Sequence, residues 1–340
     1  RSRGLLFYIK INFQKHMSTT ESNTTMNHQN APIIMDGKKT AASIQEELKE
    51  EVERLKEHEQ DGLVPGLAVV LVGDRVDSAT YVRMKKKVAS AIGIHSIDVT
   101  LPDSVSEEEL LQEITNLNQD DQVHGILVQL PLPDHINEAV VLQQIDVAKD
   151  VDGFSPWNIG NLWLRGGEPP LAVPCTPAGC IELLQRYDVD ITGKECVILG
   201  RSNIVGMPVA ALLQSCNGTV TICHSRTPNL IETIQRADIL IAAIGKAEYV
   251  RGDWCKPGVV IVDVGINSKP DATKKRGYRL VGDVNYEECV LKASAITPVP
   301  GGVGPMTIAM LMKNTINLAR HSIGLPRMPL RNAIHRNLSH

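Results

Sequence analysis

Strand-like and helix-like segments alternate along most of this chain, and this alternation limits the folds open to it. It is typical of parallel sheets whose strands are joined by crossover helices. Two such series occur. The first has a helical pattern over residues 39–55 and expected strands over residues 67–72, 96–100 and 125–130; the second has expected strands over residues 195–199, 219–223, 239–244 and 259–264, each after a helix. The sequence therefore predicts an α/β protein of two α/β domains, the second a Rossmann-like dinucleotide-binding domain, with a catalytic cleft between them.

Helix start signals occur in both predicted domains, and the second of them lies at the expected domain boundary. A capping box at Ser106 and Glu109 is expected to open a helix in the first domain. Thr176 and Pro177 are typical of an N-cap followed by proline at the first helical position, which would begin a helix to Tyr187. We expect a catalytic domain over residues 33–175 plus 306–325, a nucleotide-binding domain over residues 176–305, and disordered ends over residues 1–32 and 326–340.

Composition narrows the functional classes. A length of 340 residues is enough for two domains, and a net charge of -4 argues against nucleic acid as a partner. No apolar run approaches the roughly 20 residues of a membrane span, so we expect a soluble protein. The seven cysteines lie between Cys175 and Cys289 without a CxxC pair or a histidine cluster, which predicts reduced core residues in an intracellular compartment and no metal site.

The first thirty residues differ from the rest. They are basic, with no acidic residue before Glu21, and then become rich in Ser, Thr and Asn. Such a stretch fits an organelle transit peptide, but an extraneous translated leader is equally compatible, with Met17 or Met26 as the true start. We expect a cytoplasmic protein, with a mitochondrial or plastid location as the alternative.

Tyr81 and Lys85 lie four residues apart in a helical pattern, which places them on one helix face. The apolar stripe of this helix is expected at Met84, Val88, Ala91 and Ile92. Lys85 lies beside that stripe, whereas Lys86 and Lys87 are expected in water. A lysine stripped of water binds its proton less tightly. Taken alone, the three successive lysines are more typical of a solvated face.

Two further polar positions come where open α/β sheets bind ligands. Gln129 lies near the carboxyl end of the apolar strand expected over residues 125–130. Asp150 and Asp152 follow in the segment K-D-V-D-G, on what should be a loop. Paired acidic residues before a glycine most often form only a turn.

The second domain carries a candidate cofactor site. Its first strand leads into G-R-S-N-I-V-G-M-P at residues 200–208, where a glycine lets the backbone approach a pyrophosphate and a helix begins. This is not a complete G-x-G-x-x-G fingerprint. An NAD site usually has an acidic residue after the next strand, but this chain has H-S-R-T at residues 224–227, with Arg201 nearby. We infer NADP over NAD.

Two later segments have no regular pattern. Residues 269–279 form a basic segment with Gly and Pro, and residues 297–307 read T-P-V-P-G-G-V-G-P-M-T, in which Pro and Gly disfavour helix and strand. Because the second segment opens directly into an apolar helix, we interpret it as a shaped loop that passes a ligand and not as a linker.

Five motifs in order resemble those of the FolD-type bifunctional methylenetetrahydrofolate dehydrogenase/cyclohydrolase family, over about residues 33–325. They are Y-V-x-x-K at residues 81–85, V-Q-L-P-L-P at 128–133, K-D-V-D-G at 149–153, G-R-S-x-x-V-G-x-P at 200–208 and P-G-G-V-G-P-M-T at 300–307. Each motif alone is of moderate specificity, and the five together are highly specific.

The resemblance implies NADP-dependent oxidation of 5,10-methylenetetrahydrofolate to the methenyl form, then hydrolysis to 10-formyltetrahydrofolate, within one-carbon metabolism and purine biosynthesis. It implies Lys85 as general acid/base, Tyr81 stacking on the folate, Gln129 bonding Lys85 and Asp152 holding the pterin. It also implies a folate-lining turn and a cofactor site, with Arg201 and Ser225 on the 2'-phosphate. The turn comprises Pro300, Gly301, Gly302 and Val303, and the cofactor site comprises Gly200, Arg201, Ser202, Ile204, Val205, Gly206 and Ser225.

The resemblance further implies a homodimer through the second domain. We expect two activities and not three, because the chain has no room for the formate–tetrahydrofolate ligase domain of larger relatives. The segment after Leu325 does not match the family. Two alternatives remain open: another two-domain NADP-dependent dehydrogenase, or a non-catalytic nucleotide-binding or interaction module that has kept the fold.

Overall fold

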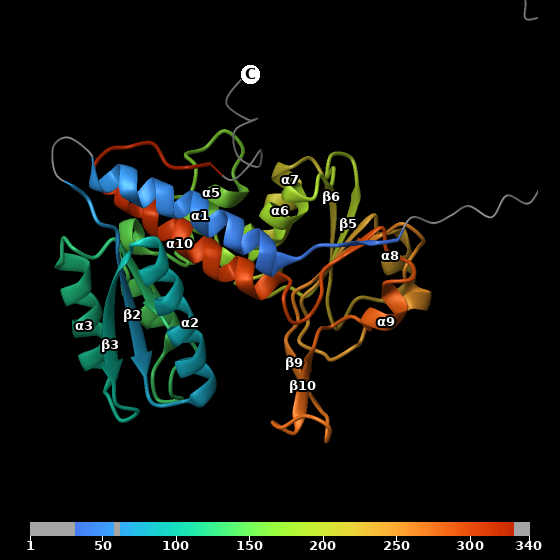
Figure 1. Cartoon of the computed structure of the whole chain (residues 1–340), viewed down its shortest axis with the longest axis horizontal. Coiled ribbons are helices and arrows are strands. Elements are labelled where there is room, and N and C mark those ends of the chain that lie inside the picture. The colour runs from blue at the N-terminus through green and yellow to red at the C-terminus, as the bar shows by residue number, and fades with distance from the viewer. Residues whose placement is uncertain (1–30, 58–61, 330–340) are drawn as a thin grey trace, which may run out of the picture. The chain divides into compact units, whose positions relative to one another are not determined.

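The computed structural model describes residues 31–57 and 62–329, without the side chains of residues 76–79. The expected leader up to residue 30 and the tail beyond residue 329 lie outside the described residues. Within them, the chain forms two parallel sheets, a two-stranded hairpin and the helices that cover the sheets (Figure 1). The predicted α/β class, with a Rossmann-like second domain, is confirmed.

The first sheet has three parallel strands in the order β3-β2-β4. Its central strand β2 (Gly66–Val72) is buried along almost its whole length, because β3 (His95–Leu101) and β4 (Gly125–Val128) flank it and helices cover it. The predicted capping box is present: Ser106 Oγ accepts from the Glu109 N–H, and Glu109 accepts from the Ser106 N–H. The helices of this region are α2 (Val76–Ile92), α3 (Glu107–Gln119), α4 (Glu138–Gln144), η1 (Val147–Lys149) and α5 (Pro156–Trp163).

The second sheet has six strands in the order β1-β11-β8-β7-β5-β6, and every pairing in it is parallel. Its strands are β1 (Ile33–Ile34), β5 (Glu195–Leu199), β6 (Thr219–Cys223), β7 (Ile239–Ala242), β8 (Val260–Asp263) and β11 (Ala295–Ile296). The helical elements between them are α7 (Gly206–Ser215), α8 (Leu230–Arg236), η2 (Gly252–Trp254) and α9 (Tyr286–Cys289).

Two long helices join the regions around the sheets. α1 (Gly37–Lys56) and α10 (Val303–Ser322) lie side by side, and α10 also packs on α2 and on α6 (Cys175–Arg186) (Figure 1). Both contribute to the largest core cluster, which extends from Leu67 on β2 to Ile198 on β5. One continuous core therefore supports both sheets.

Several expected boundaries are wrong. α6 begins at Cys175, so Pro177 is its third residue and not its first. Proline fits there because the first N–H groups of a helix have no partner within it. α10 likewise begins at Val303, inside the segment expected to be irregular. The expected first domain starts at residue 33, but Ile33 and Ile34 add a strand to the second sheet.

Three other expectations are corrected. Residues 269–279 overlap an antiparallel hairpin of β9 (Asn267–Pro270) and β10 (Tyr278–Val281). The helix expected before β8 is only the short 3-10 turn η2. Residues 326–329, expected to be disordered, are hydrogen-bonded to α10 and to residues 169–170.

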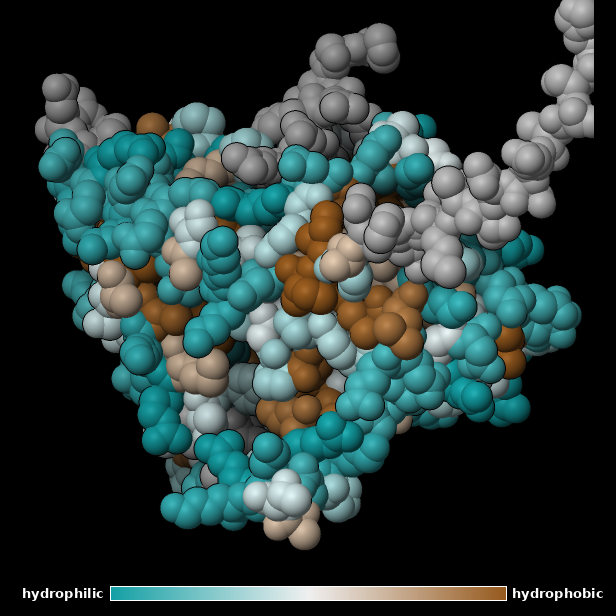
Figure 2. Space-filling model, turned by 45° about the vertical axis from the view of Figure 1, so that its right-hand side comes forward, coloured by the Kyte–Doolittle hydropathy of each residue, from teal (hydrophilic) through white to brown (hydrophobic). Residues whose placement is uncertain are grey.

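The cysteines behave as predicted. All seven are free, and all but the half-buried Cys216 are buried. Most of the face drawn in Figure 2 is hydrophilic, with smaller groups of apolar residues between.

Candidate active site

Lys85 and Gln129 meet between α2 and the end of β4. Both are half-buried, and Lys85 Nζ donates to Gln129 Oε1 at 3.0 Å. Gln129 Nε2 donates in turn to the carbonyl oxygen of Leu130 at 2.8 Å, which turns its oxygen toward the lysine. The predicted contact between Lys85 and Gln129 is confirmed.

The buried stripe of α2 differs from the expected one. Val82, Ala89 and Ile92 form it, whereas Met84 is 47% exposed. Lys85 lies on this stripe, since it is three residues after Val82 and four before Ala89. Of the expected stripe, Ala91 is exposed and Val88 is half-buried. Of the other two lysines, Lys87 is exposed as predicted, but Lys86 forms an ion pair with Asp98 at 2.8 Å.

The two acids of K-D-V-D-G have different environments. The buried Asp150 accepts four hydrogen bonds, from the N–H groups of residues 153–155 and from Asn158 Nδ2. Among the described residues, the carboxylate of Asp152 accepts only the long contact from Cys175 Sγ, at 3.9 Å. Asp150 therefore builds the turn, and Asp152 keeps oxygen atoms available for a ligand.

Lys85, Asp152 and Cys175 interact electrostatically. Burial lowers the pKa of Lys85, and the charge of Asp152 partly opposes this. Burial raises the pKa of Asp152 to about 6, against the opposing effect of Lys85. Burial and the nearby Asp152 raise the pKa of Cys175, so its thiol keeps the proton it donates. The cluster therefore contains a lysine whose pKa is lowered and a carboxylate whose pKa is raised to about 6.

Tyr81 lies one helical turn before Lys85 and is 43% exposed, so its ring is open to a flat ligand. In the turn over residues 300–303, Pro300 is exposed and Gly301 is half-buried. Gly302 is buried and Val303, 4% exposed, packs in the core, so the Val303 side chain does not line an open surface. No hydrogen bond between described residues joins Tyr81 or this turn to the lysine cluster.

A second site lies at the carboxyl ends of β5, β6 and β7. A cavity of about 320 Å³ is lined by eleven residues: Leu199, Gly200, Arg201, Cys223, His224, Ser225, Leu230, Ala243, Ile244, Lys246 and Tyr249. The predicted Gly200, Arg201 and Ser225 are thus brought together. None of the lining residues is acidic, and this lack suits a ligand with a 2'-phosphate.

Glycine is required at the turn into α7. Gly200 has φ +112°, and a Cβ there would lie 2.1 Å from the Ala243 carbonyl oxygen. Ser202 Oγ accepts from the N–H groups of Val205 and Gly206 at 3.2 and 3.4 Å, which shapes the turn before the helix. Ile204 is 45% exposed beside it. The backbone N–H groups of this turn can thus approach a pyrophosphate. The residues that line the cavity fit NADP.

Sequence reasoning missed several residues at both sites. Lys246 lies over the Tyr249 ring, 5.2 Å from its centroid, and both line the cavity. Lys246 follows the strand expected over residues 239–244, so the strand-end rule that identified Gln129 would have found it. Cys175 and Asn314 beside Asp152 gave no such signal, because they come from distant helices.

The described residues hold no group of three or more His, Cys, Asp or Glu arranged for a metal ion. Within the same residues, no helix combines the length and apolar character needed to cross a membrane.

Comparison with known proteins identifies the family. Residues 35–152 match the tetrahydrofolate dehydrogenase/cyclohydrolase catalytic domain, and residues 174–323 match the NAD(P)-binding domain of the same family.

Sequence similarity to known relatives extends over most of this chain. The chloroplastic bifunctional protein FolD 4 of Arabidopsis thaliana is 58% identical over 288 residues, which are 85% of this chain and 79% of that protein. Bifunctional FolD of Acetivibrio thermocellus is 54% identical over 84% of this chain and 96% of its own. The crystal structure of Trypanosoma brucei FolD, complexed with NADP cofactor and inhibitor, is 43% identical, with a TM-score of 0.82 over 86% of this chain and 99% of that one. This chain belongs to the tetrahydrofolate dehydrogenase/cyclohydrolase family.

Proposed function

We propose that this chain oxidises 5,10-methylenetetrahydrofolate with NADP and hydrolyses the methenyl product to 10-formyltetrahydrofolate. The observation that carries the proposal is the contact of Lys85 Nζ with Gln129 Oε1 at 3.0 Å, beside Asp152. The same chain has a cavity of about 320 Å³ behind the Gly200 turn, with no acidic residue in its lining. Oxidation would use both sites, and hydrolysis would use the Lys85 site alone.

Hydrolysis needs a base near neutral pH, because a water must lose a proton as it attacks the methenyl carbon. Lys85 fits this role, since burial lowers its pKa and increases the fraction of free amine. Gln129 holds the amine through its oxygen and leaves the nitrogen lone pair directed elsewhere. As the tetrahedral intermediate opens, the C–N5 bond breaks, the lysine returns the proton to N5, and the hydroxyl proton leaves to solvent as the formyl carbonyl forms.

Asp152 and Tyr81 would bind the folate substrate. The Asp152 carboxylate is not used by the backbone of its own turn, so it can accept N–H groups of the pterin. The exposed Tyr81 ring can stack on the folate. The outer part of the turn, Pro300 and Gly301, would line the same ligand.

The dehydrogenase step depends mainly on positioning two ligands. NADP accepts the hydride from the methylene carbon. Gly200 and the start of α7 would hold its pyrophosphate, while Arg201 and Ser225 would bind the 2'-phosphate. Lys246 also lines the cavity and adds a further cationic group.

The direct test mixes the purified chain with methylenetetrahydrofolate and either nicotinamide cofactor, and follows the absorbance of the methenyl product. We expect product with NADP and much less with NAD. A preference for NAD would contradict the assignment of Arg201 and Ser225. Absence of product with either cofactor would favour a non-catalytic module, and turnover of an amino or hydroxy acid instead would favour another dehydrogenase.

For assembly we propose a homodimer formed through the second domain. β6 ends the six-stranded sheet in the described part of the chain, and its edge could receive a second copy. Light scattering of the purified chain tests this, and a monomer mass at micromolar concentration would contradict it.

For the physiological role we propose supply of 10-formyltetrahydrofolate to purine biosynthesis in the cytoplasm. The name of the Arabidopsis relative includes the word chloroplastic, so import is the competing outcome. Imaging a tagged chain with and without residues 1–25 separates the two. A plastid or mitochondrial signal that is lost with these residues would overturn the cytoplasmic location.

A further inference from the structure

Residues 326–329, which we call the strap, turn back along α10 and are held by its side chains. Lys313 Nζ donates to the Pro329 carbonyl oxygen at 2.8 Å, and Arg320 Nε donates to that of Pro326 at 2.7 Å. These two positions and Asn317 are spaced so that they fall along one face of the helix.

Asn317 completes the hold on the strap. Its Nδ2 donates to the Met328 carbonyl oxygen at 3.2 Å, and its Oδ1 accepts from the Met328 N–H at 2.8 Å. Side chains of α10 thus bind main-chain atoms of the strap. A fixed backbone lets the strap present one side chain, that of Arg327, in a defined direction.

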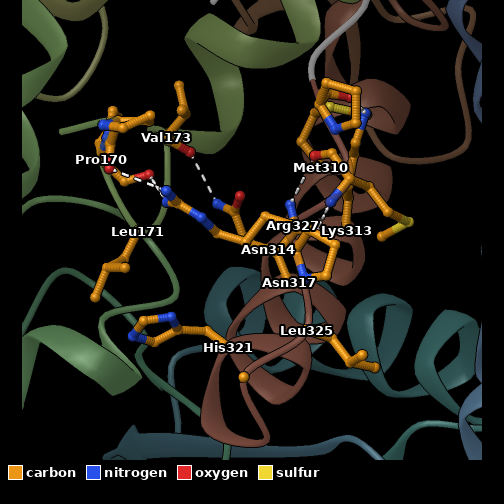
Figure 3. Close-up of a pocket in the computed structure, with 15 residues that line it drawn as sticks. Pro170, Leu171, Val173, Met310, Lys313, Asn314, Asn317, His321, Leu325 and Arg327 are labelled. Atoms are coloured by element: carbon orange, nitrogen blue, oxygen red, sulfur yellow. Dashed lines mark hydrogen bonds between the residues drawn. The ribbon is translucent and has the colours of Figure 1, made fainter.

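Arg327 reaches across a cavity of about 620 Å³ to the segment before α6 (Figure 3). Its two terminal nitrogens donate to the carbonyl oxygens of Pro170 and, at 3.1 Å, of Pro169. Burial lowers the pKa of Arg327, and the two carbonyl oxygens compensate for part of its lost hydration. The strap therefore ties α10 to residues 169–170.

Residues 171–172, directly after this contact, are linked through Asn158 on α5 to the turn that carries Asp152. Asn158 Oδ1 accepts from the N–H groups of Leu171 and Ala172, at 2.8 and 3.3 Å. Asn158 Nδ2 donates to Asp150 Oδ2 at 3.0 Å, and Asp150 holds the turn around Asp152. A continuous series of hydrogen bonds thus runs from the strap to the turn.

A second route leaves the same stretch of α10. Asn314, next to Lys313, donates to the carbonyl oxygens of Val151 and Val173, at 2.9 and 2.8 Å. It also donates to Cys175 Sγ at 3.6 Å, and this thiol is the contact of Asp152. Asn314 thus holds the backbone at Val151, next to Asp152, and at Val173, and Figure 3 shows the bond to Val173.

We propose that the strap is a positioning element for Asp152, and that the bonds of Arg327 to residues 169–170 restrain the turn around Asp152. This rests on the proposed function, because it assumes that Asp152 binds the pterin. Without Arg327, residues 169–172 lose their tie to α10, and the turn around Asp152 samples more positions. Substrate binding then weakens, while the cofactor site behind Gly200 keeps its contacts.

The test compares the intact chain with two truncations and two point variants. A chain ending at Leu325 lacks the strap, and a chain ending at Pro329 keeps it and serves as the matched control. Arg327→Ala removes one side chain, and Arg327→Lys keeps the charge but cannot donate to both carbonyl groups in the same fork. Calorimetry measures the affinity for tetrahydrofolate and for NADP, and kinetics measures KM and kcat.

Loss of the strap and Arg327→Ala should each raise the Kd for tetrahydrofolate and the KM for its methylene derivative by about tenfold. NADP affinity should stay within about twofold, Arg327→Lys should fall between, and the chain ending at Pro329 should match the intact one. Should the chain ending at Leu325 fail to fold, the point variant decides.

Two results overturn the proposal: unchanged folate affinity in Arg327→Ala, or equal losses for folate and NADP, which indicate general destabilisation. An intact chain that binds tetrahydrofolate without turnover would contradict the proposed function but not the strap.

Discussion

Replacing Asp152 by asparagine should make the folded chain more stable while it weakens folate binding. Burial raises the pKa of Asp152 from 3.8 to about 6, so the ionised carboxylate is less favourable in the folded chain than in the unfolded one. Asparagine has nearly the same shape and carries no charge. It removes that cost and keeps one acceptor oxygen for Cys175.

The sign follows from proton linkage. Between pH 3.8 and about 6 the folded chain keeps a proton that the unfolded chain has released, so the free energy of unfolding falls as pH rises through this window. Above it, the ionised Asp152 costs up to about 3 kcal/mol, because one pH unit corresponds to about 1.4 kcal/mol. At pH 8 the variant should be more stable by that amount at most.

Urea unfolding of both proteins at pH 8 and at pH 3.5 measures the effect. The difference should be present at pH 8 and nearly absent at pH 3.5, where the wild-type carboxyl is protonated in both states. Folate KM should rise at least about tenfold in the variant, since the pterin loses a charged acceptor. In the wild type, activity should fall as pH decreases through about 6, and the variant should lack this limb.

Asp150→Asn is the matched control in the same turn. Asp150 accepts four hydrogen bonds, and an amide has a single acceptor oxygen for them. This variant should lose about 2 kcal/mol or more of stability. If Asp152→Asn were as destabilising at pH 8 as Asp150→Asn, the assignment of a turn residue and a ligand residue would be refuted.

Three further predictions concern the nucleotide-binding domain. Gly200→Ala places a Cβ 2.1 Å from the Ala243 carbonyl oxygen, so NADP binding should be lost and thermal unfolding should move to lower temperature; normal affinity would contradict the close approach. Ser225→Asp adds the acid typical of NAD sites and should lower kcat/KM for NADP at least about tenfold while raising it for NAD, as steady-state kinetics would show. Asp283→Asn should cost about 2 kcal/mol or more in urea unfolding, because this buried carboxylate accepts from the N–H groups of residues 244–246 beside the cavity; an unchanged midpoint would exclude that role.

Most of the fold could be predicted because local patterns dominate it. The expected strand over residues 219–223 coincides with β6, and the capping box at Ser106 forms as expected. Boundaries were less accurate where proline or glycine falls in the first turn of a helix. Pro177 and Pro305 lie inside α6 and α10 and not before them, because a first turn needs few of its own N–H groups.

Features that depend on distant partners could not be predicted. β1 has only two residues and forms because β11, more than 250 positions later, offers an edge. The strap looks like a disordered basic tail, since nothing local shows that Lys313, Asn317 and Arg320 will bind its backbone.

The candidate site shows the same division. Tyr81 and Lys85 follow from helical spacing, and Gln129 from its place at a strand end. Cys175 on α6 contacts Asp152, and Asn314 on α10 contacts Cys175, so the packing of those two helices decides both contacts. The Lys86 ion pair with Asp98 likewise depends on how α2 lies against β3.

The central claim is that Lys85 serves hydrolysis and not hydride transfer, and Lys85→Met tests it most directly. Methionine keeps the apolar stem in the α2 stripe and removes the amine that contacts Gln129. Single-turnover hydrolysis of methenyltetrahydrofolate should slow by at least about 100-fold, the usual contribution of a general base, while tetrahydrofolate affinity stays within about threefold. A hydrolysis rate equal to that of the wild type, in a variant that is folded and binds folate, would contradict the account.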